Sequence, residues 1–236
     1  MAEITPPPWS YSSITLFKTC PRKYQAERVT KEVPFRDTEA TLYGKAVHTA
    51  AEEYVRDGKP IDPKYQFIEP VLRGLKAIRG EKHCELKVGI KKTEDSYEHC
   101  DFFDPDVWFR GVADLVILRE DSAFVVDFKT SKSSRYADST QLALMSLAVF
   151  LKHPNIQYTN AALVFLVVGA HGAPVHEWFI KETYKRESMY KVIADLYPVL
   201  KQRKQCYETG EFPATRNGLC SAWCQVSSCV YHGKRR

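Results

Sequence analysis

An apolar run ends in an acid and a lysine at Val125-Val126-Asp127-Phe128-Lys129-Thr130-Ser131. Side chains on a β-strand alternate between its two faces, so Asp127 and Lys129 are expected on one face and Phe128 in the core. A carboxylate and an ammonium would then meet at one place. Taken alone, an Asp-x-Lys pattern is in most proteins a solvated strand end, so its meaning depends on the residues around it.

A second carboxylate, Asp114, lies in the middle of the apolar run Gly111–Leu118. A charge in such a run needs a partner or a metal, unless the strand is half exposed and Asp114 faces water. Magnesium and manganese prefer oxygen ligands, which Asp114, Asp127 and the backbone carbonyl of Phe128 can offer. Two acids and a lysine suggest metal-assisted phosphodiester hydrolysis in which Lys129 stabilises the developing charge.

The composition is that of a soluble globular protein. The 236 residues, 44% of them hydrophobic, can bury one sizeable core, so we expect a single domain over residues 1–236. A net charge of +5 permits a polyanionic partner without requiring one. The amino terminus lacks the features of a secretory signal, and the longest apolar stretch, 161–168, is too short to cross a bilayer. We therefore expect a cytoplasmic protein without membrane contact.

Hydrophobic periodicity and turn residues divide the chain into helices and strands. Helices are predicted at 40–57, 65–79, 141–151 and 183–205, where Pro70 either starts or kinks the second one. Strands are predicted at 84–91, 97–103, 107–118, 123–128, 161–168 and 173–181. This order predicts an α/β domain with a mixed central sheet flanked by helices.

Several motifs follow one another in a recognisable order along the chain. They are Gly44-x-x-x-His48, Gly111-x-x-Asp114, Asp127-x-Lys129 and Gln141, after an opening segment Ser12-x-x-x-Leu16-Phe17-x-x-Cys20-Pro21-x-x-Tyr24. In these motifs, over nearly its whole length, the chain resembles the RecB-like exonuclease branch of the PD-(D/E)XK nuclease superfamily. That branch includes exonucleases of phage and bacterial recombination and the CRISPR adaptation nucleases. The resemblance implies a restriction-endonuclease-like core.

The resemblance also implies roles for particular residues. His48, Asp114, Asp127 and the Phe128 carbonyl are similar to the family's ligands for magnesium or manganese, and Lys129 to its catalytic lysine. Taken alone, His48 would be an ordinary helix histidine.

Gln141 resembles the start of the family's Gln-x-x-x-Tyr motif, which helps to orient DNA and the active site. The tyrosine position holds Met145, so the phenol's contribution is missing here. Glu85 is interpreted as a solvated strand residue, with a place near the metal as the alternative.

Seven cysteines, an odd number in a chain without an export signal, indicate reduced thiols or metal ligands. Cys220, Cys224 and Cys229 lie within ten residues of one another, and Cys20 is a possible fourth ligand; Cys84, Cys100 and Cys206 are expected to be ordinary thiols.

Some members of the family hold a [4Fe-4S] cluster with one early and three late cysteines, and the chain resembles this iron-sulfur type. The late spacing is x3 then x4, whereas the family more often has x2 then x5. Structural zinc, with His232 as a further ligand, and no metal at all are the alternatives. Either metal would clasp the helical segment 10–30 to the cysteine-rich tail 213–236.

The leading hypothesis is a divalent-metal-dependent DNA nuclease, an exonuclease acting on DNA ends or single strands in replication, recombination or repair. The resemblance leaves room for a phage-encoded protein acting in the host cytoplasm, and for a recombination or replication protein as partner. A non-catalytic nucleic-acid-binding scaffold and a structure-specific endonuclease are the alternatives. Four aromatic residues could stack on bases, although each type is more often part of a core: Trp9, Tyr11, Trp108 and Trp223.

Overall fold

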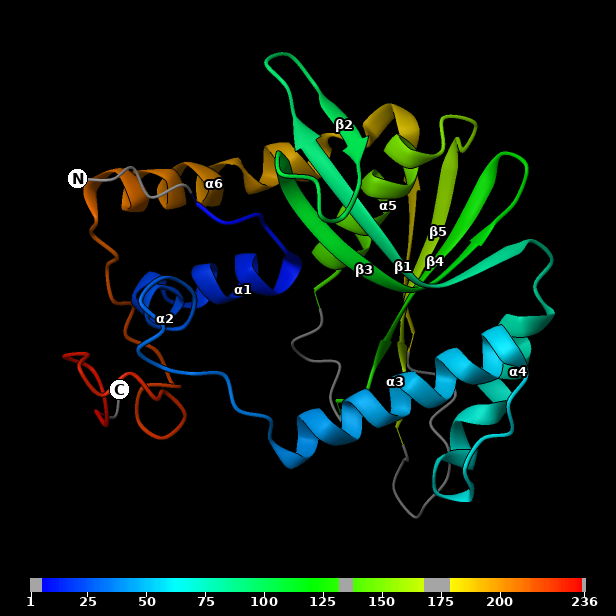
Figure 1. Cartoon of the computed structure of the whole chain (residues 1–236), viewed down its shortest axis with the longest axis horizontal. Helices are drawn as coiled ribbons and strands as arrows, with labels where there is room; N and C mark the ends of the chain where they lie inside the picture. The colour runs from blue at the N-terminus through cyan, green and yellow to red at the C-terminus, as the bar shows by residue number, and fades with distance from the viewer. Residues whose placement is uncertain (1–5, 132–137, 168–178, 235–236) are drawn as a thin grey trace. The chain divides into compact units, whose positions relative to one another are not determined.

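A six-stranded mixed sheet is the largest element of the chain (Figure 1). The structure is a computed structural model that describes residues 6–131, 138–167 and 179–234. Within them the strand order is β2-β1-β3-β4-β5-β6, and only β4 and β5 are parallel neighbours. The mixed sheet confirms the predicted fold class. The strands are β1 (Glu81–Lys92), β2 (Tyr97–Cys100), β3 (Val107–Leu118), β4 (Ser122–Lys129), β5 (Tyr158–Phe165) and β6 (Phe179–Lys185).

The chain divides into two compact units, and each has a hydrophobic core of its own. The central unit, Asp37–Val192, contains the whole sheet and the helices packed on it. The terminal unit joins Met1–Arg36 to Ile193–Arg236. Among the described residues, every helix is too short or too polar to cross a membrane.

Helix α3 (Glu39–Asp57) covers one face of the sheet (Figure 1). It begins at a capping box, in which Thr38 and Thr41 satisfy each other's backbone N–H groups, and it ends at Gly58 with φ 72°. Its apolar side, centred on Ala51, packs against Val126 and Phe128 of β4. His48 lies within this helix, which therefore carries its imidazole to the sheet.

Helix α5 (Thr140–Lys152) carries the crossover from β4 to β5, because parallel neighbours cannot be joined by a tight turn. Residues 144–150 are all buried, as expected for a helix covered on every side. The side chain of Gln141 reaches Asp127, whereas α3 contacts the neighbouring residue Phe128. Because adjacent strand residues point to opposite faces, the two helices meet opposite faces of β4.

The structure departs from the predicted elements in three places. The segment 65–79 is a 3-10 turn, η2 (Pro63–Ile68), followed by α4 (Glu69–Ala77), so Pro70 starts a helix rather than kinking one. β2 ends at Cys100 because the next residues form turns, in which the Asp104 N–H donates to the Asp101 carbonyl at 3.0 Å.

The predicted last helix begins too early. Residues up to Lys185 belong to β6, which pairs with β5, and α6 runs over Lys191–Thr209. A local pattern cannot show this pairing, because the partner strand lies far away in the sequence. Most of the strand predicted at 173–181 falls outside the described residues, as does the end of the one predicted at 161–168.

The terminal unit packs short helices from the start of the chain with α6. These helices are α1 (Tyr11–Thr19), α2 (Pro21–Tyr24) and η1 (Gln25–Val29), and their core includes Phe17, Tyr24 and Cys206. The buried Arg203 guanidinium donates to the Tyr24 hydroxyl at 3.0 Å and to the Pro7 carbonyl at 2.6 Å. A buried charge needs such partners, so Arg203 holds the proline-rich leader against α6.

Candidate metal and catalytic site

The site lies where strands β3 and β4 separate. Their ladder runs from Leu118–Ala123 to Leu115–Val126. One residue further, the Asp114 carboxylate accepts a hydrogen bond from the Phe128 backbone N–H at 2.5 Å. A side-chain oxygen here takes the place that a backbone carbonyl would have in a continued ladder. Asp114 is thus fixed between the two strands.

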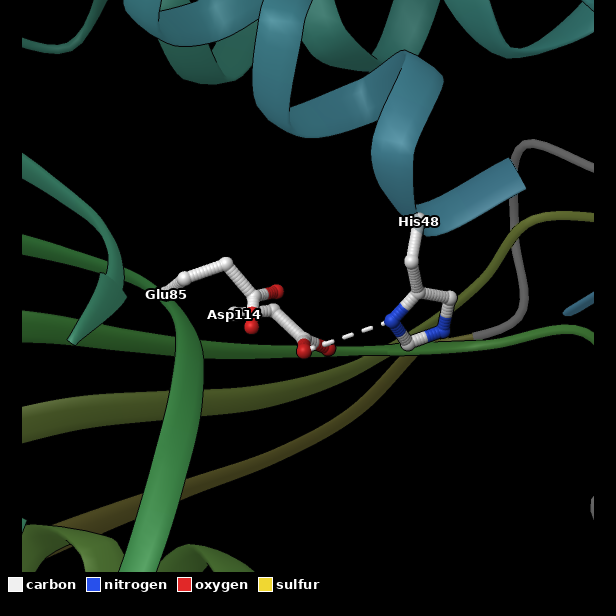
Figure 2. A group of neighbouring side chains, drawn as sticks. All are labelled: His48, Glu85 and Asp114. Atoms are coloured by element: carbon white, nitrogen blue, oxygen red, sulfur yellow. Dashed lines mark ion pairs between the residues drawn. The ribbon is translucent and has the colours of Figure 1, made fainter. Parts of the chain in front are cut away.

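Three potential metal ligands converge at this point (Figure 2). They are His48 of α3, Glu85 of β1 and Asp114 of β3, each half-buried, with one ligand atom from each lying within 4.8 Å of the others. His48 Nδ1 lies 3.3 Å from Asp114 Oδ1. An imidazole and two carboxylates form a donor set that suits manganese or magnesium.

The backbone turns Glu85 toward this group. Glu85 faces Asp114 across the β1–β3 ladder, between the pairs Cys84–Leu115 and Leu86–Ala113, and its φ is 50°. This left-handed conformation is unfavourable for a residue with a side chain, by about 1–3 kcal/mol, and tends to occur at functional sites. The interpretation of Glu85 as a solvated strand residue is therefore wrong.

Negative charge accumulates around the three ligands. Burial, and then the charge of Asp114, raises the pKa of Glu85. Burial and Asp114 likewise raise the pKa of Asp127 to about 6, although Lys129 opposes the shift. Burial disfavours the charged form of His48, but the Asp114, Asp127 and Glu85 carboxylates together raise its pKa. A divalent cation would relieve this mutual repulsion.

Asp127, Lys129 and Gln141 form a closed ring of polar contacts beside the ligands. Lys129 Nζ lies 2.6 Å from Asp127 Oδ2 and donates to Gln141 Oε1 at 2.7 Å, while Gln141 Nε2 donates to Asp127 Oδ1. Asp127 Oδ2 has no hydrogen-bond partner of good geometry, but its short distance to the ammonium makes it an ion pair. Asp127 is only 4% exposed, so both of its oxygens are held.

The residues predicted for the site fall into two adjoining groups. His48 and Asp114 belong to the ligand group with Glu85, and Asp127 belongs to the ring with Lys129 and Gln141. Among the described residues, Asp127 does not join the compact ligand group. The sequence did not predict the place of Glu85, because the register that sets it opposite Asp114 joins two strands that are distant in the chain.

Met145, at the position of the family's tyrosine, is part of the core. It is 2% exposed, and a Cβ added at Gly111 would lie 2.4 Å from its Cε. Met145 thus fills space that Gly111 leaves empty. The fifth residue of the motif serves packing in this chain.

The four cysteines from the two ends of the chain line one cavity in the terminal unit. Backbone N–H groups donate to two of the sulfurs, from Thr215 to Cys20 at 3.3 Å and from Asn217 to Cys220 at 3.5 Å. The cavity is lined by residues that include Cys20, Cys220, Cys224 and Cys229, while His232 is not among them.

The spacing of the sulfurs bears on which metal could bind. A tetrahedral zinc site with Zn–S bonds of about 2.3 Å places its sulfurs about 3.8 Å apart. Among the described residues, no three of these sulfurs lie within 4.8 Å of one another. The four sulfurs are therefore not all at zinc-ligand distances from one another in this structure. The remaining cysteines, Cys84, Cys100 and Cys206, are free thiols with buried or half-buried side chains.

The fold and the site together define a metal-dependent nuclease. The chain belongs to the PD-(D/E)XK nuclease superfamily, whose family model matches residues 8–229. The nucleases of this superfamily use divalent metals and act on nucleic acid, which agrees with the His-Glu-Asp group.

Two solved structures resemble this chain at low sequence identity. A "Putative exonuclease" from Eubacterium rectale is 12% identical with a TM-score of 0.54, over 92% of this chain and 86% of that one. The protein SSO0001 is also 12% identical, with a TM-score of 0.38 over 92% of this chain and 91% of that one. No curated protein matches the chain in sequence. The Eubacterium rectale structure supports the assignment of the fold, and at this identity it says nothing further about function.

Proposed function

We propose that the protein is a divalent-metal-dependent DNA exonuclease of the RecB-like, iron-sulfur-containing type. The observation that carries the catalytic part is the ring of Asp127, Lys129 and Gln141 beside His48 and Asp114. The non-catalytic scaffold is disfavoured, because a binding module has no need of a lysine aligned between a buried carboxylate and an amide.

The donor set of the site fits magnesium or manganese. His48, Asp114 and Glu85, which already lie together, would hold the ion. The resemblance adds Asp127 and the Phe128 carbonyl, and Asp127 would have to exchange one of its contacts with Lys129 or Gln141 for the ion. When bound, the ion neutralises the scissile phosphate and lowers the pKa of an attacking water. Burial, and then the neighbouring Asp114 carboxylate, raises the pKa of Glu85 and that of Asp127, and a bound cation would favour the charged form of both.

Lys129 and Gln141 supply the remaining chemistry. Lys129 is aimed into the site by Asp127 and Gln141, from where its ammonium can orient water and stabilise the charge on the phosphate as the P–O bond breaks. Gln141 touches both charged groups of the ring and is a positioning residue.

The finer functional assignments rest on the motif order. DNA as the substrate, attack at ends or single strands, and a role in replication, recombination or repair follow from the RecB-like resemblance. So do a phage-encoded origin with action in the host cytoplasm and a recombination or replication protein partner. An endonuclease would need a recognition element or a dimer, and no feature of the described residues supplies one.

We also propose that Cys20, Cys220, Cys224 and Cys229 hold a [4Fe-4S] cluster. Their common cavity and the N–H groups donated to two of the sulfurs support a shared metal centre, and the choice of an iron-sulfur cluster over zinc rests on the resemblance of the cysteine pattern to the iron-sulfur type.

The contacts around the cavity link the two ends of the chain. The Arg22 guanidinium donates to the Ser228 hydroxyl at 2.6 Å, and Asn217 Nδ2 donates to the Thr19 carbonyl at 3.2 Å. The cluster would clasp the segment 10–30 to the tail 213–236 within a single nuclease domain over residues 1–236. Its role would be structural.

The nuclease proposal is tested with end-labelled linear DNA, single- and double-stranded, against circular DNA. Cleavage should need magnesium or manganese, should require an end, and should disappear in Asp127→Ala and in Lys129→Ala. Activity that persists in both variants would overturn the site assignment, and equal cleavage of circles would favour the endonuclease. Phe103→Ala, at an exposed position outside the site, is the matched control.

The cluster proposal is tested on protein purified without oxygen. Iron and sulfide in about equal amounts, with broad absorbance near roughly 400 nm that is lost in Cys20→Ser, are expected. Stoichiometric zinc in colourless protein would overturn it. Cys206→Ala is the control, since Cys206 packs in the terminal core and does not line the cavity.

A further inference from the structure

The net positive charge of this protein lies in the terminal unit. Residues 1–36 and 193–236 contain 13 lysines and arginines against six aspartates and glutamates, a net charge of +7. Residues 37–192 contain 21 against 23, a net charge of −2. The net charge of the terminal unit is therefore complementary to a polyanion, whereas that of the central unit is close to neutral.

The four aromatic residues that could stack on bases differ in their exposure to solvent. Trp9 is 3% exposed and lies under the Arg203 guanidinium, so it is a core residue. Tyr11 and Trp108 are half-buried. Trp223 is 75% exposed. Of these four candidates, only Trp223 presents most of its surface to solvent.

Trp223 is held by an ordered turn of the cysteine-rich tail. Its backbone N–H donates to the Leu219 carbonyl at 3.0 Å, and the N–H of the next residue, Cys224, donates to the same carbonyl at 2.9 Å. The Gly233 N–H closes the tail by donating to the Cys220 carbonyl at 2.9 Å. A fixed backbone around an exposed indole reduces the entropy lost when a ligand binds.

We infer that the terminal unit is a binding site for single-stranded nucleic acid, with an unpaired base stacked on Trp223. The charge of +7 is complementary to a phosphate backbone, and every base offers a π-face to an exposed indole. Paired bases in a duplex are already stacked, so the indole favours single strands. This inference rests on the proposed function, because it names the form of the substrate that the nuclease would receive.

The chain offers a matched control for Trp223. Phe103 is also 75% exposed, but it lies in the central unit in a segment with three carboxylates. If exposed aromatic surface alone promoted binding of nucleic acid, substitution of Trp223 and of Phe103 would weaken binding equally. Stacking on nucleic acid would appear only at Trp223. The carboxylates are those of Asp101, Asp104 and Asp106.

The test measures fluorescence anisotropy of a labelled oligo(dT) without added divalent metal, where cleavage does not occur. Trp223→Ala should weaken binding by about 5-fold to 150-fold, the range for loss of one stacked base, while Trp223→Phe should stay within about threefold of the parent protein. Phe103→Ala should bind as the parent does. A duplex of the same length should bind more weakly than the single strand and should lose little in Trp223→Ala.

Several outcomes would overturn the inference. They are unchanged oligonucleotide binding in Trp223→Ala, a loss of affinity in Phe103→Ala as large as that in Trp223→Ala, and a loss of affinity for the duplex as large as that for the single strand. Unchanged oligonucleotide binding in Trp223→Ala would indicate that the exposed indole contacts a protein partner instead. Unchanged circular dichroism and iron content of Trp223→Ala show that the tail still folds; should that variant misfold, the comparison of Trp223→Phe with Trp223→Leu decides.

The inference and the proposed function fail separately. Binding that depends on Trp223, in a protein without metal-dependent cleavage, would overturn the proposed function alone. Metal-dependent cleavage with no effect of Trp223 on binding would overturn this inference alone.

Discussion

Replacing Gln141 by alanine tests how the acid–lysine pair is held. The amide accepts a hydrogen bond from Lys129 at 2.7 Å and donates one to Asp127, so Gln141→Ala removes a contact from each charged group. Lys129 then keeps Asp127 as its ionic partner but loses the second contact that fixes its direction. A lysine side chain is flexible, and one contact does not define its position.

The size of the effect follows from the contacts. A hydrogen bond to a charged group contributes about 1.5–3 kcal/mol. Asp127 remains paired with Lys129, so the transition state should lose about the stabilisation of one hydrogen bond, the one between Gln141 and the Lys129 ammonium. At about 1.4 kcal/mol for each factor of ten, kcat should fall by about 10-fold to 150-fold. KM should change much less, since Gln141 contacts groups of the protein.

The assay is the initial rate of nucleotide release from end-labelled single-stranded DNA at saturating magnesium. Thr140→Ala is the matched control: Thr140 precedes Gln141 in α5 and bonds Asp138 through its hydroxyl, outside the ring. Its kcat should remain within about twofold of the parent. An unchanged kcat in Gln141→Ala, with Lys129→Ala inactive, would refute positioning by Gln141.

Three further outcomes are expected. In urea unfolding, Gly111→Ala should lower the free energy of unfolding by about 1–3 kcal/mol, because the new Cβ would meet Met145. Gly74→Ala, in α4 with open space around it, should raise the free energy of unfolding by up to about 1 kcal/mol, and equal effects of the two substitutions would contradict this packing. Asp114→Ala should be less stable than Asp114→Asn by about 1–3 kcal/mol, because asparagine still accepts from the Phe128 N–H, and equal stability would argue against that hydrogen bond. Burial lowers the pKa of His153, so the unfolded state binds more protons below about pH 6.5; stability should fall on acidification, less steeply in His153→Asn, and parallel profiles would contradict this. The groups around His153 are Lys152, His83 and His99, which lower its pKa further, and Glu81, which raises it.

The local parts of the site were predictable from the sequence. A period of two placed Asp127 and Lys129 on one strand face, and they lie 2.6 Å apart. The apolar run around Asp114 predicted a carboxylate with a partner, and it accepts a hydrogen bond from Phe128. These predictions need only the geometry of one strand and the unfavourable burial of an unpaired charge.

Other features depended on residues far apart in the chain. The start of the last helix was misplaced because β6 pairs with β5, a contact without a local signal. Glu85 needed a left-handed backbone and a register opposite Asp114 to reach the ligand group. The spare space at Gly111 had no meaning until Met145 was found to fill it.

The sequence alone thus determined the fold class, the order of the motifs and the pairing of Asp127 with Lys129. Only the tertiary structure decided that Gln141 completes a ring with that pair, that Glu85 joins the ligand group, and that Trp223 is exposed while Trp9 is buried. The physical reason is that strand and helix periodicity act over a few residues. Ligand geometry and solvent exposure are set instead by contacts between segments that only folding brings together.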